Sequence, residues 1–271
     1  MSIPIWQVDA FSDRPFSGNS AAIVLLDSYP DDQWLQDFAM EMNLSETSFL
    51  VTQDDRNSFQ LRWFTPTVEV DLCGHATLAA AHTLFEKHLA DASRPIVFQT
   101  HSGKLTCSKG AQGITLDFPS SPLVEEVQGE LASRVCDSLG INRGTKVVRS
   151  IFDLIAVVDD AEIVTSAEPD FRKMAEIDTR GVVLTSLSEV EDYDFISRFF
   201  APQSGINEDP VTGSAHCFLA PYWGMQLNRS RLVGYQASSR GGVVHCETIG
   251  ERVHLTGQAV TVFEGRLIAS A

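Results

Sequence analysis

The sequence predicts an α+β fold built from two related halves. Strand-like and helix-like segments follow one another without the regular alternation that produces a doubly wound sheet. In addition, the segment FQLRWFTP at residues 59–66 recurs as FISRFFAP at residues 195–202. Arg62 and Arg198 are 136 positions apart (198 minus 62) in a chain of 271 residues. Each copy leads through a loop into a helical stretch of small residues, so we expect a duplicated strand–loop–helix unit.

The first half is expected to contain short strands and two helices. The pattern of apolar residues predicts strands at residues 3–11, 20–26, 47–51, 59–64, 96–99, 104–108 and 114–118. Asp31 is a suitable N-cap for a helix whose apolar face comprises Trp34, Leu35, Phe38, Ala39 and Met42. A second helix, at residues 76–86, is expected directly after the loop at Gly74.

The expected linker is Pro119–Pro122, because proline cannot join the centre of a hydrogen-bonded sheet. It separates an N-terminal half, residues 1–118, from a C-terminal half, residues 123–271. In the second half we expect helices at residues 125–139 and 169–176 and from Gly213 onward. We expect strands at residues 154–158, 182–185 and 195–200, with several more between 232 and 268. Whether the C-terminal strands stay in the second half or return to the first is left open.

The composition is typical of a globular protein and disfavours nucleic-acid, metal and membrane partners. Hydrophobic residues make up 44% of the chain, and 20 basic against 36 acidic residues give a net charge of −16. Such a field repels phosphate backbones, so no nucleic-acid partner is expected. The five cysteines are scattered without a CxxC pair, which predicts neither a disulfide framework nor a metal site. The sequence shows no signal-peptide pattern and no apolar run of membrane-spanning length, so we expect a cytoplasmic location and no membrane partner.

Both loops that follow the repeated segment place a glycine at a helix start. Gly74 precedes His75, and Gly213 precedes Ser214. Helix N-termini expose backbone N–H groups, and glycine lets a ligand approach the backbone closely, so these positions favour a carboxylate or an enolate oxygen. The alternative is a pair of ordinary capped helix starts that bind nothing. Two related loops with the same glycine predict a small anionic ligand.

Glu46 is a candidate general base because the other half lacks an equivalent carboxylate. Residues 43–52 align without gaps on residues 176–185, an offset of 133 (176 minus 43), which places Glu46 opposite Thr179. A carboxylate found in one half only is not required by the shared scaffold. The alternative is a solvated loop glutamate, the commonest fate of this residue type.

Cys73 is a second candidate for the chemistry. A thiol beside a helix N-terminus is expected to have a lowered pKa and to act as a nucleophile or base. The corresponding position of the second loop carries Pro210 or Val211, so a racemase with two opposed thiols is not supported. The alternative is a small buried core residue.

A set of motifs that runs from end to end resembles the PhzF-like (phenazine-biosynthesis-like) family of the diaminopimelate-epimerase-like fold. The motifs are VDAF at residues 8–11, FSGN at 16–19, LSETSF at 44–49, RWFTP at 62–66, DLCGHAT at 71–77, EDPVTGSAH at 208–216 and QASSRGG at 236–242. The set is specific for the family but not for one substrate.

The resemblance implies two pseudo-symmetric halves, each a curved, mostly antiparallel sheet around a central helix, with the site between them. It implies a homodimer and an isomerase without a cofactor or metal. In that family the residue matching Glu46 moves a proton between carbons, while those matching His75, Asp209 and Ser214 hold the substrate and help to move protons. The amides around Gly74 and Gly213 would hold its carboxylate. The other substrate-binding candidates beside these motifs are Asn19, Ser45, Ala76 and Thr212.

The sequence therefore supports one hypothesis and leaves two others open. The first is an isomerase that moves a proton on a small amino acid-like or cyclic carboxylate, with Glu46 as the general acid and base. The second is a non-catalytic protein that binds a small molecule on the same scaffold. The third is an epimerase that uses the single thiol of Cys73.

Overall fold

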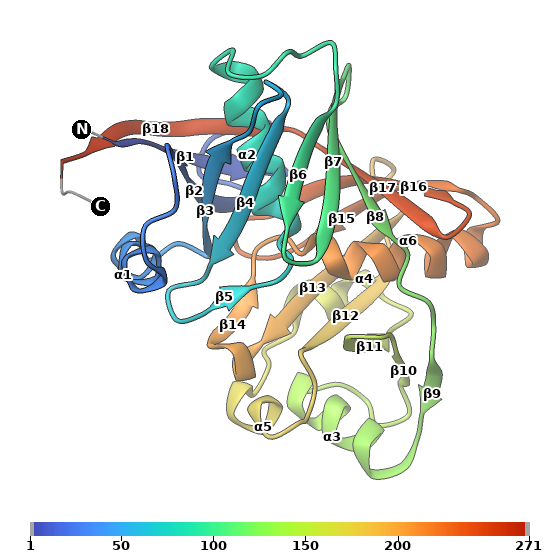
Figure 1. The fold of residues 1–271 in the computed structure, drawn as a ribbon. Coiled ribbons are helices and arrows are strands. Elements are labelled where there is room, and N and C mark those ends of the chain that lie inside the picture. Colours follow the sequence, from blue (N-terminus) through green and yellow to red (C-terminus); the bar gives the residue numbers. More distant parts are fainter. Residues whose placement is uncertain (1–2, 269–271) are drawn as a thin grey trace. The chain divides into compact units, whose positions relative to one another are not determined.

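The computed structural model describes residues 3–268, which form two compact units (Figure 1). Unit 1 comprises the described residues up to Phe118 together with those from Leu255 onward, and unit 2 comprises Pro119–His254. The second boundary falls inside strand β17 (Arg252–Gly257). The last strand, β18 (Ala259–Leu267), pairs antiparallel with β1 (Ile3–Ala10), so the chain returns to unit 1.

Unit 1 is a mixed, mainly antiparallel sheet. Its further strands are β2 (Asn19–Leu26), β3 (Glu46–Thr52), β4 (Ser58–Phe64), β5 (Glu69–Val70), β6 (Ile96–Thr100), β7 (Gly103–Gly110) and β8 (Gly113–Pro119). The pairs β1–β2, β3–β4, β4–β5, β6–β7 and β7–β8 are antiparallel, whereas β2–β3 and β4–β6 are parallel. A helix lies in the chain between the members of each parallel pair, as a parallel crossover requires.

Helix α2 (Gly74–Glu86) is the buried centre of unit 1. It contacts β1, β2, β3 and β18, and its run of small residues lets it pack closely against them (Figure 1). Helix α1 (Asp32–Met42) packs Leu35 and Phe38 against a core that includes Phe49. The predicted N-cap is confirmed, because the Asp31 side chain accepts a 2.8 Å hydrogen bond from the Trp34 amide.

Unit 2 repeats this topology. Its strands are β9 (Glu125–Val127), β10 (Lys146–Arg149), β11 (Asp153–Val157), β12 (Gly181–Leu187), β13 (Phe195–Ala201), β14 (Ile206–Asp209), β15 (Arg231–Gln236) and β16 (Gly242–Ile249). The pairs β11–β12 and β13–β15 are parallel, and β10–β11, β12–β13, β13–β14 and β15–β16 are antiparallel. Helix α6 (Gly213–Leu227) packs on β15 and β16, whereas α2 packs on β1, β2, β3 and β18. The smaller helices are α3 (Gly129–Leu139), α4 (Ala161–Ser166), α5 (Phe171–Ala175) and the 3-10 turn Pro202–Ser204.

The arginine of the repeated segment supports the scaffold in both units. Arg62 pairs with both carboxylate oxygens of Glu69 at 2.7 Å, and its guanidinium lies 5.1 Å from the centre of the Phe64 ring. Arg198 pairs with Glu208 at 2.7 and 2.9 Å, and its guanidinium lies 5.0 Å from the Phe200 ring. In each unit the arginine therefore connects the long strand to the short strand that precedes the central helix.

The strand register corrects the sequence alignment around Glu46. Thr47 pairs with Phe64, and Val182 pairs with Phe200, which is the repeat equivalent of Phe64 (64 plus 136). The residues before them, Glu46 and Gly181, are therefore equivalent, and Thr179 is not the counterpart of Glu46. The gapless alignment failed because the offset is 135 at these strands (182 minus 47) and not 133.

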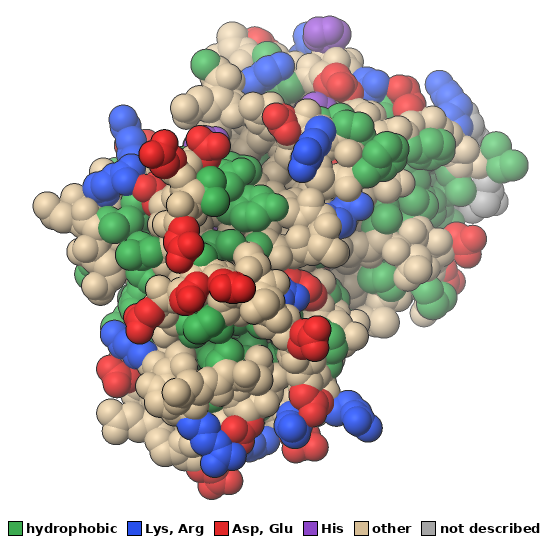
Figure 2. Space-filling model, turned by 180° about the vertical axis from the view of Figure 1, so that it is seen from behind, with side chains coloured by type: hydrophobic (Ala, Val, Ile, Leu, Met, Phe, Trp, Pro, Cys, Tyr) green, Lys and Arg blue, Asp and Glu red, His purple; other side chains and the backbone are tan. Residues whose placement is uncertain are grey.

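The order of elements otherwise differs from the prediction at several short elements, among them strands β5 and β14, which were not expected. The segment expected as one helix over residues 125–139 begins with the strand β9, which pairs with β10, and the helix starts only at Gly129, whose φ is +70°. Helix α4 and strand β10 were not expected, because both are short and weakly patterned. None of the helices within residues 3–268 has the length and apolarity to cross a bilayer. On the face seen in Figure 2, lysines and arginines lie in small groups among acidic and apolar side chains.

Candidate active site

The start of α2 brings Glu46 and His75 into contact inside unit 1. Glu46 is the first residue of β3, and His75 is the second residue of α2. Glu46 Oε2 lies 3.0 Å from His75 Nε2, and the two side chains are only 12% and 5% exposed. Neither atom has a further hydrogen-bond partner within the described residues, and the two do not align as a regular hydrogen bond. The contact is therefore a buried pair of an acid and a base.

The protonation of His75 depends on this carboxylate. Burial by itself lowers the pKa of His75, but negative charge at Cys73 and Glu46 raises it, and the net pKa lies well above the usual value. Burial raises the pKa of the Cys73 thiol to about 11, so the thiol is neutral near pH 7. Glu46 and the hydrogen bond with Cys73 both favour the protonated imidazole.

Asn19 contacts the other side of the imidazole. Its side-chain amide lies 3.1 Å from His75 Nδ1, and Asn19 is fully buried at the start of β2. An amide can present either its NH₂ group or its carbonyl oxygen. Asn19 can therefore match either protonation state of Nδ1.

The structure contradicts the expectation that Cys73 has a lowered pKa. Cys73 precedes α2, its sulfur lies 3.5 Å from His75 Nδ1, and burial raises rather than lowers its pKa. The register of the two loops places Thr212, not Pro210 or Val211, opposite Cys73, because each is the N-cap residue before the helix glycine. The second unit still supplies no thiol at this position, and Cys73 itself is a buried, neutral thiol.

Glu46, Cys73 and His75 also form a group of three possible metal ligands, with their donor atoms within 4.8 Å of one another. The imidazole lies between the other two, with Nε2 toward Glu46 and Nδ1 toward Cys73. A metal would require the Cys73 thiolate, and burial raises the pKa of this thiol to about 11. The neutral thiol therefore disfavours a metal centre at this group.

Both central helices begin without a side-chain cap. Neither Cys73 nor Thr212, their N-cap residues, accepts a hydrogen bond from its own helix through its side chain. Asp31, Asp160 and Asp170 do provide such a bond at α1, α4 and α5. The first amides of α2 and α6, at Gly74 and Ala76 and at Gly213, therefore keep their capacity to bind an anion. Ser45 lies half-buried beside Glu46 and forms no side-chain hydrogen bond within the described chain.

In unit 2, Gln236 holds the loop that contains Asp209 and Thr212. The Thr212 hydroxyl donates to Asp209 Oδ2 at 2.5 Å and accepts from Gln236 Nε2 at 3.2 Å, and it does not cap α6. The fully buried Gln236 side chain accepts from the Thr212 amide at 2.8 Å and donates to the Asp209 carbonyl at 2.7 Å. Gln236 was not among the predicted site residues, although it opens one of the sequence motifs.

Two further residues support the start of α6. Arg180 Nη1 donates to Ser214 Oγ at 3.0 Å, and its other nitrogens bind the carboxylate of Asp153. Burial raises the pKa of Asp153, although Arg180 lowers it. Neither Arg180 nor Asp153 was predicted from the sequence. The pattern that could have indicated them is a charged side chain at the end of each of two apolar strands.

The structure thus groups the predicted residues within each unit. In unit 1, Asn19, Glu46 and His75 meet at the start of α2, where Gly74 and Ala76 lie. In unit 2, the other four predicted residues lie at the start of α6: Asp209, Thr212, Gly213 and Ser214.

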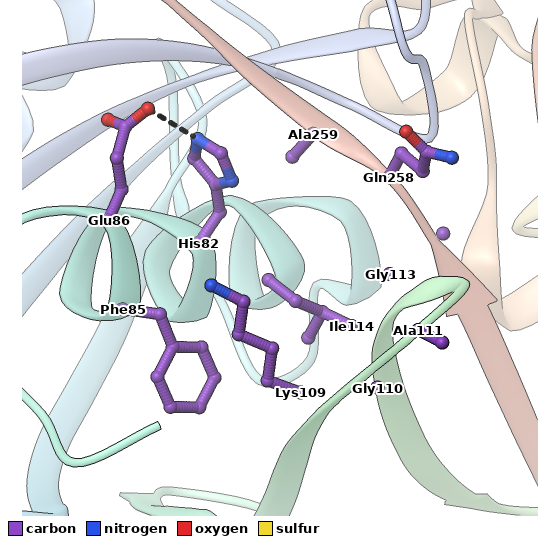
Figure 3. Close-up of a pocket in the computed structure, with 11 residues that line it drawn as sticks. His82, Phe85, Glu86, Lys109, Gly110, Ala111, Gly113, Ile114, Gln258 and Ala259 are labelled. Atoms are coloured by element: carbon purple, nitrogen blue, oxygen red, sulfur yellow. Dashed lines mark ion pairs between the residues drawn. The ribbon is translucent and has the colours of Figure 1, made fainter. Parts of the chain in front are cut away.

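A separate cavity of about 350 Å³ lies in unit 1, beyond the predicted residues (Figure 3). His82, Phe85 and Glu86 line it from α2, and Lys109 lines it from β7. His82 and Glu86 lie 3.6 Å apart, and burial lowers the pKa of His82. A second cavity, of about 360 Å³, lies in unit 2 beside Gly224 and Arg229. Neither cavity includes a predicted site residue.

Comparison with known proteins establishes the family. The family model described as "Phenazine biosynthesis-like protein" matches residues 8–265. The chain belongs to the PhzF-like family. This match confirms the family that the sequence motifs indicate, from VDAF near the N-terminus to QASSRGG.

Several relatives of this PhzF-like chain are named isomerases. It is 49% identical over 269 residues to an uncharacterized isomerase of Halalkalibacterium halodurans, covering 99% of both chains. An uncharacterized isomerase of Pseudomonas aeruginosa is 44% identical over 267 residues, covering 98% of this chain and 99% of the relative. A mouse phenazine biosynthesis-like domain-containing protein is 39% identical, with 99% of this chain and all of the relative covered. The chain is an isomerase of this family.

Solved structures agree with the α+β fold. A PhzF-family protein from Enterococcus faecalis has a TM-score of 0.88 and 38% identity, covering 99% of this chain and 100% of that chain. A hydroxyproline epimerase from Agrobacterium vitis, with 12% identity and a TM-score of 0.63, covers 98% of this chain and 91% of that chain. This second likeness concerns the fold alone. The PhzF-like and epimerase-like architecture expected from the sequence is confirmed.

Proposed function

We propose that this isomerase moves a proton between two carbons of a small carboxylate, with Glu46 as the general base and then the general acid. The observation that carries the proposal is the buried contact of 3.0 Å between Glu46 and His75 at the start of α2. A carboxylate and an imidazole in a nearly water-free position provide a proton acceptor with a cationic partner beside it. The motif match adds support, because the family places its proton-transfer residue at the position of Glu46.

The reaction balances without an added oxidant or reductant. The Glu46 carboxylate removes a proton from a carbon next to a carbonyl or alkene, and the electron pair of the C–H bond moves into that group. The protonated His75 and the first amides of α2 stabilise the negative charge that develops. The carboxylic acid of Glu46 then returns the same proton to another carbon, which regenerates the starting state of the enzyme.

The loop of unit 2 contains further polar groups that are candidates for the proposed function. Asp209 is our candidate for a second proton-handling or substrate-holding residue, supported by its place in the motif and by its fixed position beside Thr212. The amides at Gly213 and the hydroxyl of Ser214 are candidates for binding the substrate carboxylate. Action without metal or organic cofactor, a homodimeric assembly and a cytoplasmic location stay predictions.

The experiment is a screen of cyclic and amino-acid carboxylates for the uptake of solvent deuterium at carbon. We expect the wild-type protein to exchange a carbon-bound proton of its substrate and Glu46→Gln to lose at least about 10³-fold of this activity while it stays folded. Glu41→Gln, an exposed glutamate in α1, is the matched control and should retain full activity.

Two outcomes would contradict the proposal. Full exchange by Glu46→Gln on an identified substrate would exclude Glu46 as the proton-transfer residue. Saturable binding of a carboxylate with no exchange at any carbon would instead favour the non-catalytic binding protein.

A further inference from the structure

We infer that Arg180 and Asp153 form a fixed support that presents the Ser214 hydroxyl to a carboxylate group of the substrate. The inference rests on the proposed function and adds to it a specific binding group, built entirely within unit 2. It concerns two residues that no sequence motif singled out.

The guanidinium of Arg180 is held from several sides. Its Nε and Nη2 atoms donate to the two carboxylate oxygens of Asp153 at 2.9 and 2.5 Å. Asp153 is only 3% exposed, and a buried carboxylate requires such a partner. The rings of Phe152 and Phe199 lie 5.1 and 5.6 Å from the guanidinium carbon. The side chain of Arg180 is therefore fixed in one geometry, although 39% of it is exposed.

The remaining guanidinium nitrogen of Arg180, Nη1, determines the direction of the Ser214 hydroxyl. Nη1 lies 3.0 Å from Ser214 Oγ, and because arginine has no acceptor, the serine oxygen must accept this hydrogen bond. The hydroxyl hydrogen of Ser214 is then available to another acceptor, and the described chain provides none. A cationic donor on the oxygen also polarises the O–H bond and strengthens it as a donor.

The surroundings of Ser214 indicate the class of acceptor. Ser214 is the second residue of α6, whose N-cap Thr212 bonds to Asp209 and leaves the first amides of the helix uncapped. The positive charge of Arg180 is largely balanced by Asp153, so the ligand meets oriented donors rather than an unpaired cation. Oriented N–H and O–H donors suit one carboxylate group and do not suit an ammonium group.

The repeat explains why this binding group belongs to unit 2. Gly74 and Gly213 begin the equivalent helices, so Ser214 occupies the position that His75 occupies in unit 1. In unit 1 the side chain at this position contacts Glu46, and in unit 2 it contacts Arg180. The same scaffold position thus supports proton transfer in one unit and carboxylate binding in the other.

The test measures the binding of acetate and benzoate, and of the neutral acetamide and benzamide, by NMR titration of the amides of residues 213 and 214. We expect the wild-type protein to bind each carboxylate more tightly than its amide. Arg180→Lys and Ser214→Ala should each weaken carboxylate binding by about tenfold, the usual scale of one charge-assisted hydrogen bond. The double variant should bind no more weakly than Ser214→Ala, because Arg180 acts through Ser214.

Two further variants keep the test decisive. Arg231→Lys replaces an exposed arginine that pairs with Glu247, and it should bind like the wild type. If Arg180→Lys does not fold, Asp153→Asn combined with Arg180→Gln removes both charges while keeping planar side chains, and the same loss is expected. Unchanged binding by the Arg180 variants, additive losses in the double variant, or no preference for carboxylates over amides would overturn the inference. So would the failure of both carboxylates to bind.

Glu46→Gln separates this inference from the proposed function. It should keep benzoate binding within twofold, because Glu46 belongs to the proton-transfer pair and not to the support of Ser214. If Glu46→Gln retains full deuterium exchange while benzoate binding depends on Arg180, the proposed role of Glu46 fails and the carboxylate site stands. If Glu46→Gln abolishes exchange while the Arg180 variants bind normally, the proposed function stands and this inference fails.

Discussion

Glu46 Oε2 and His75 Nε2 lie 3.0 Å apart, although one residue begins a strand and the other a helix. Their positions are fixed independently, by the parallel pairing of β2 with β3 and by the packing of α2. A carboxylate held against an imidazole in this way favours the charged form of the histidine. The pair therefore holds one proton on the imidazole, and it also stabilises the fold.

The first prediction concerns the titration of His75. Its pKa should lie well above about 6.5, the usual value for histidine, because the charges and hydrogen bonds of Cys73 and Glu46 together outweigh the effect of burial. Glu46→Gln should lower this pKa, since burial then acts without the carboxylate. The measurement is an NMR titration of the His75 ring Cε1–H signal in both proteins. A midpoint at or below 6.5 in the wild type would contradict this reading.

The same pair predicts how stability depends on pH. The folded-state pKa of His75 is raised above its unfolded value, so the pair stabilises the fold fully below about pH 6.5. This contribution is lost as the pH rises through the folded-state pKa. The difference in the free energy of unfolding between wild type and Glu46→Gln should therefore shrink with rising pH, as urea denaturation at pH 6 and at higher pH can measure. A difference that grows with pH would be inconsistent with an ion pair.

The second prediction concerns Cys73. Burial raises the pKa of its thiol to about 11, so it should react very slowly with iodoacetamide near pH 7 in the folded protein. Cys73→Ala should keep the isomerase activity within a few-fold, because in the proposed function Glu46 and not the thiol transfers the proton. Rapid labelling of Cys73 with parallel loss of activity would restore the one-thiol epimerase as the better model.

Much of this architecture could be predicted from the sequence, because the repeated arginine segment and the glycine at each helix start are local patterns. The position of the last strand could not be predicted, because β18 pairs with β1 at the opposite end of the chain. The equivalence of Glu46 and Gly181 was also missed. It depends on the strand register. An alignment of the sequence alone does not determine this register, and here it was wrong by two residues.

The candidate site was predictable only in part, for a similar reason. Glu46, His75 and Ser214 lie in motifs and could be named. Arg180 and Asp153 act through contacts 27 residues apart in the chain, which no local pattern indicates. The high pKa of Cys73 also escaped prediction, because a helix start lowers a thiol pKa only where burial does not prevail.

The third prediction tests the structural role of the repeated arginine. Arg62→Ala and Arg198→Ala should each reduce the free energy of unfolding by about 2 kcal/mol, because each leaves a partly buried glutamate without its partner. Arg143→Ala, which breaks an exposed pair with Asp137, is the control and should have a much smaller effect. Urea denaturation measures all three. Losses confined to one of the two copies would contradict their equivalent roles.

The fourth prediction follows from the residue that replaces Glu46 in unit 2. A Cβ atom on Gly181 would lie 2.3 Å from the ring of Phe199, so Gly181→Ala should destabilise the protein by about 1–3 kcal/mol. In Gly110→Ala, the control, the nearest atom is 3.8 Å from the new Cβ, and a clash is not expected. Adding Phe199→Leu should restore part of the loss, because the smaller side chain makes room. If Gly181→Ala is as stable as wild type, a side chain fits at this position. A lack of space would then not explain why unit 2 has no carboxylate at the position of Glu46.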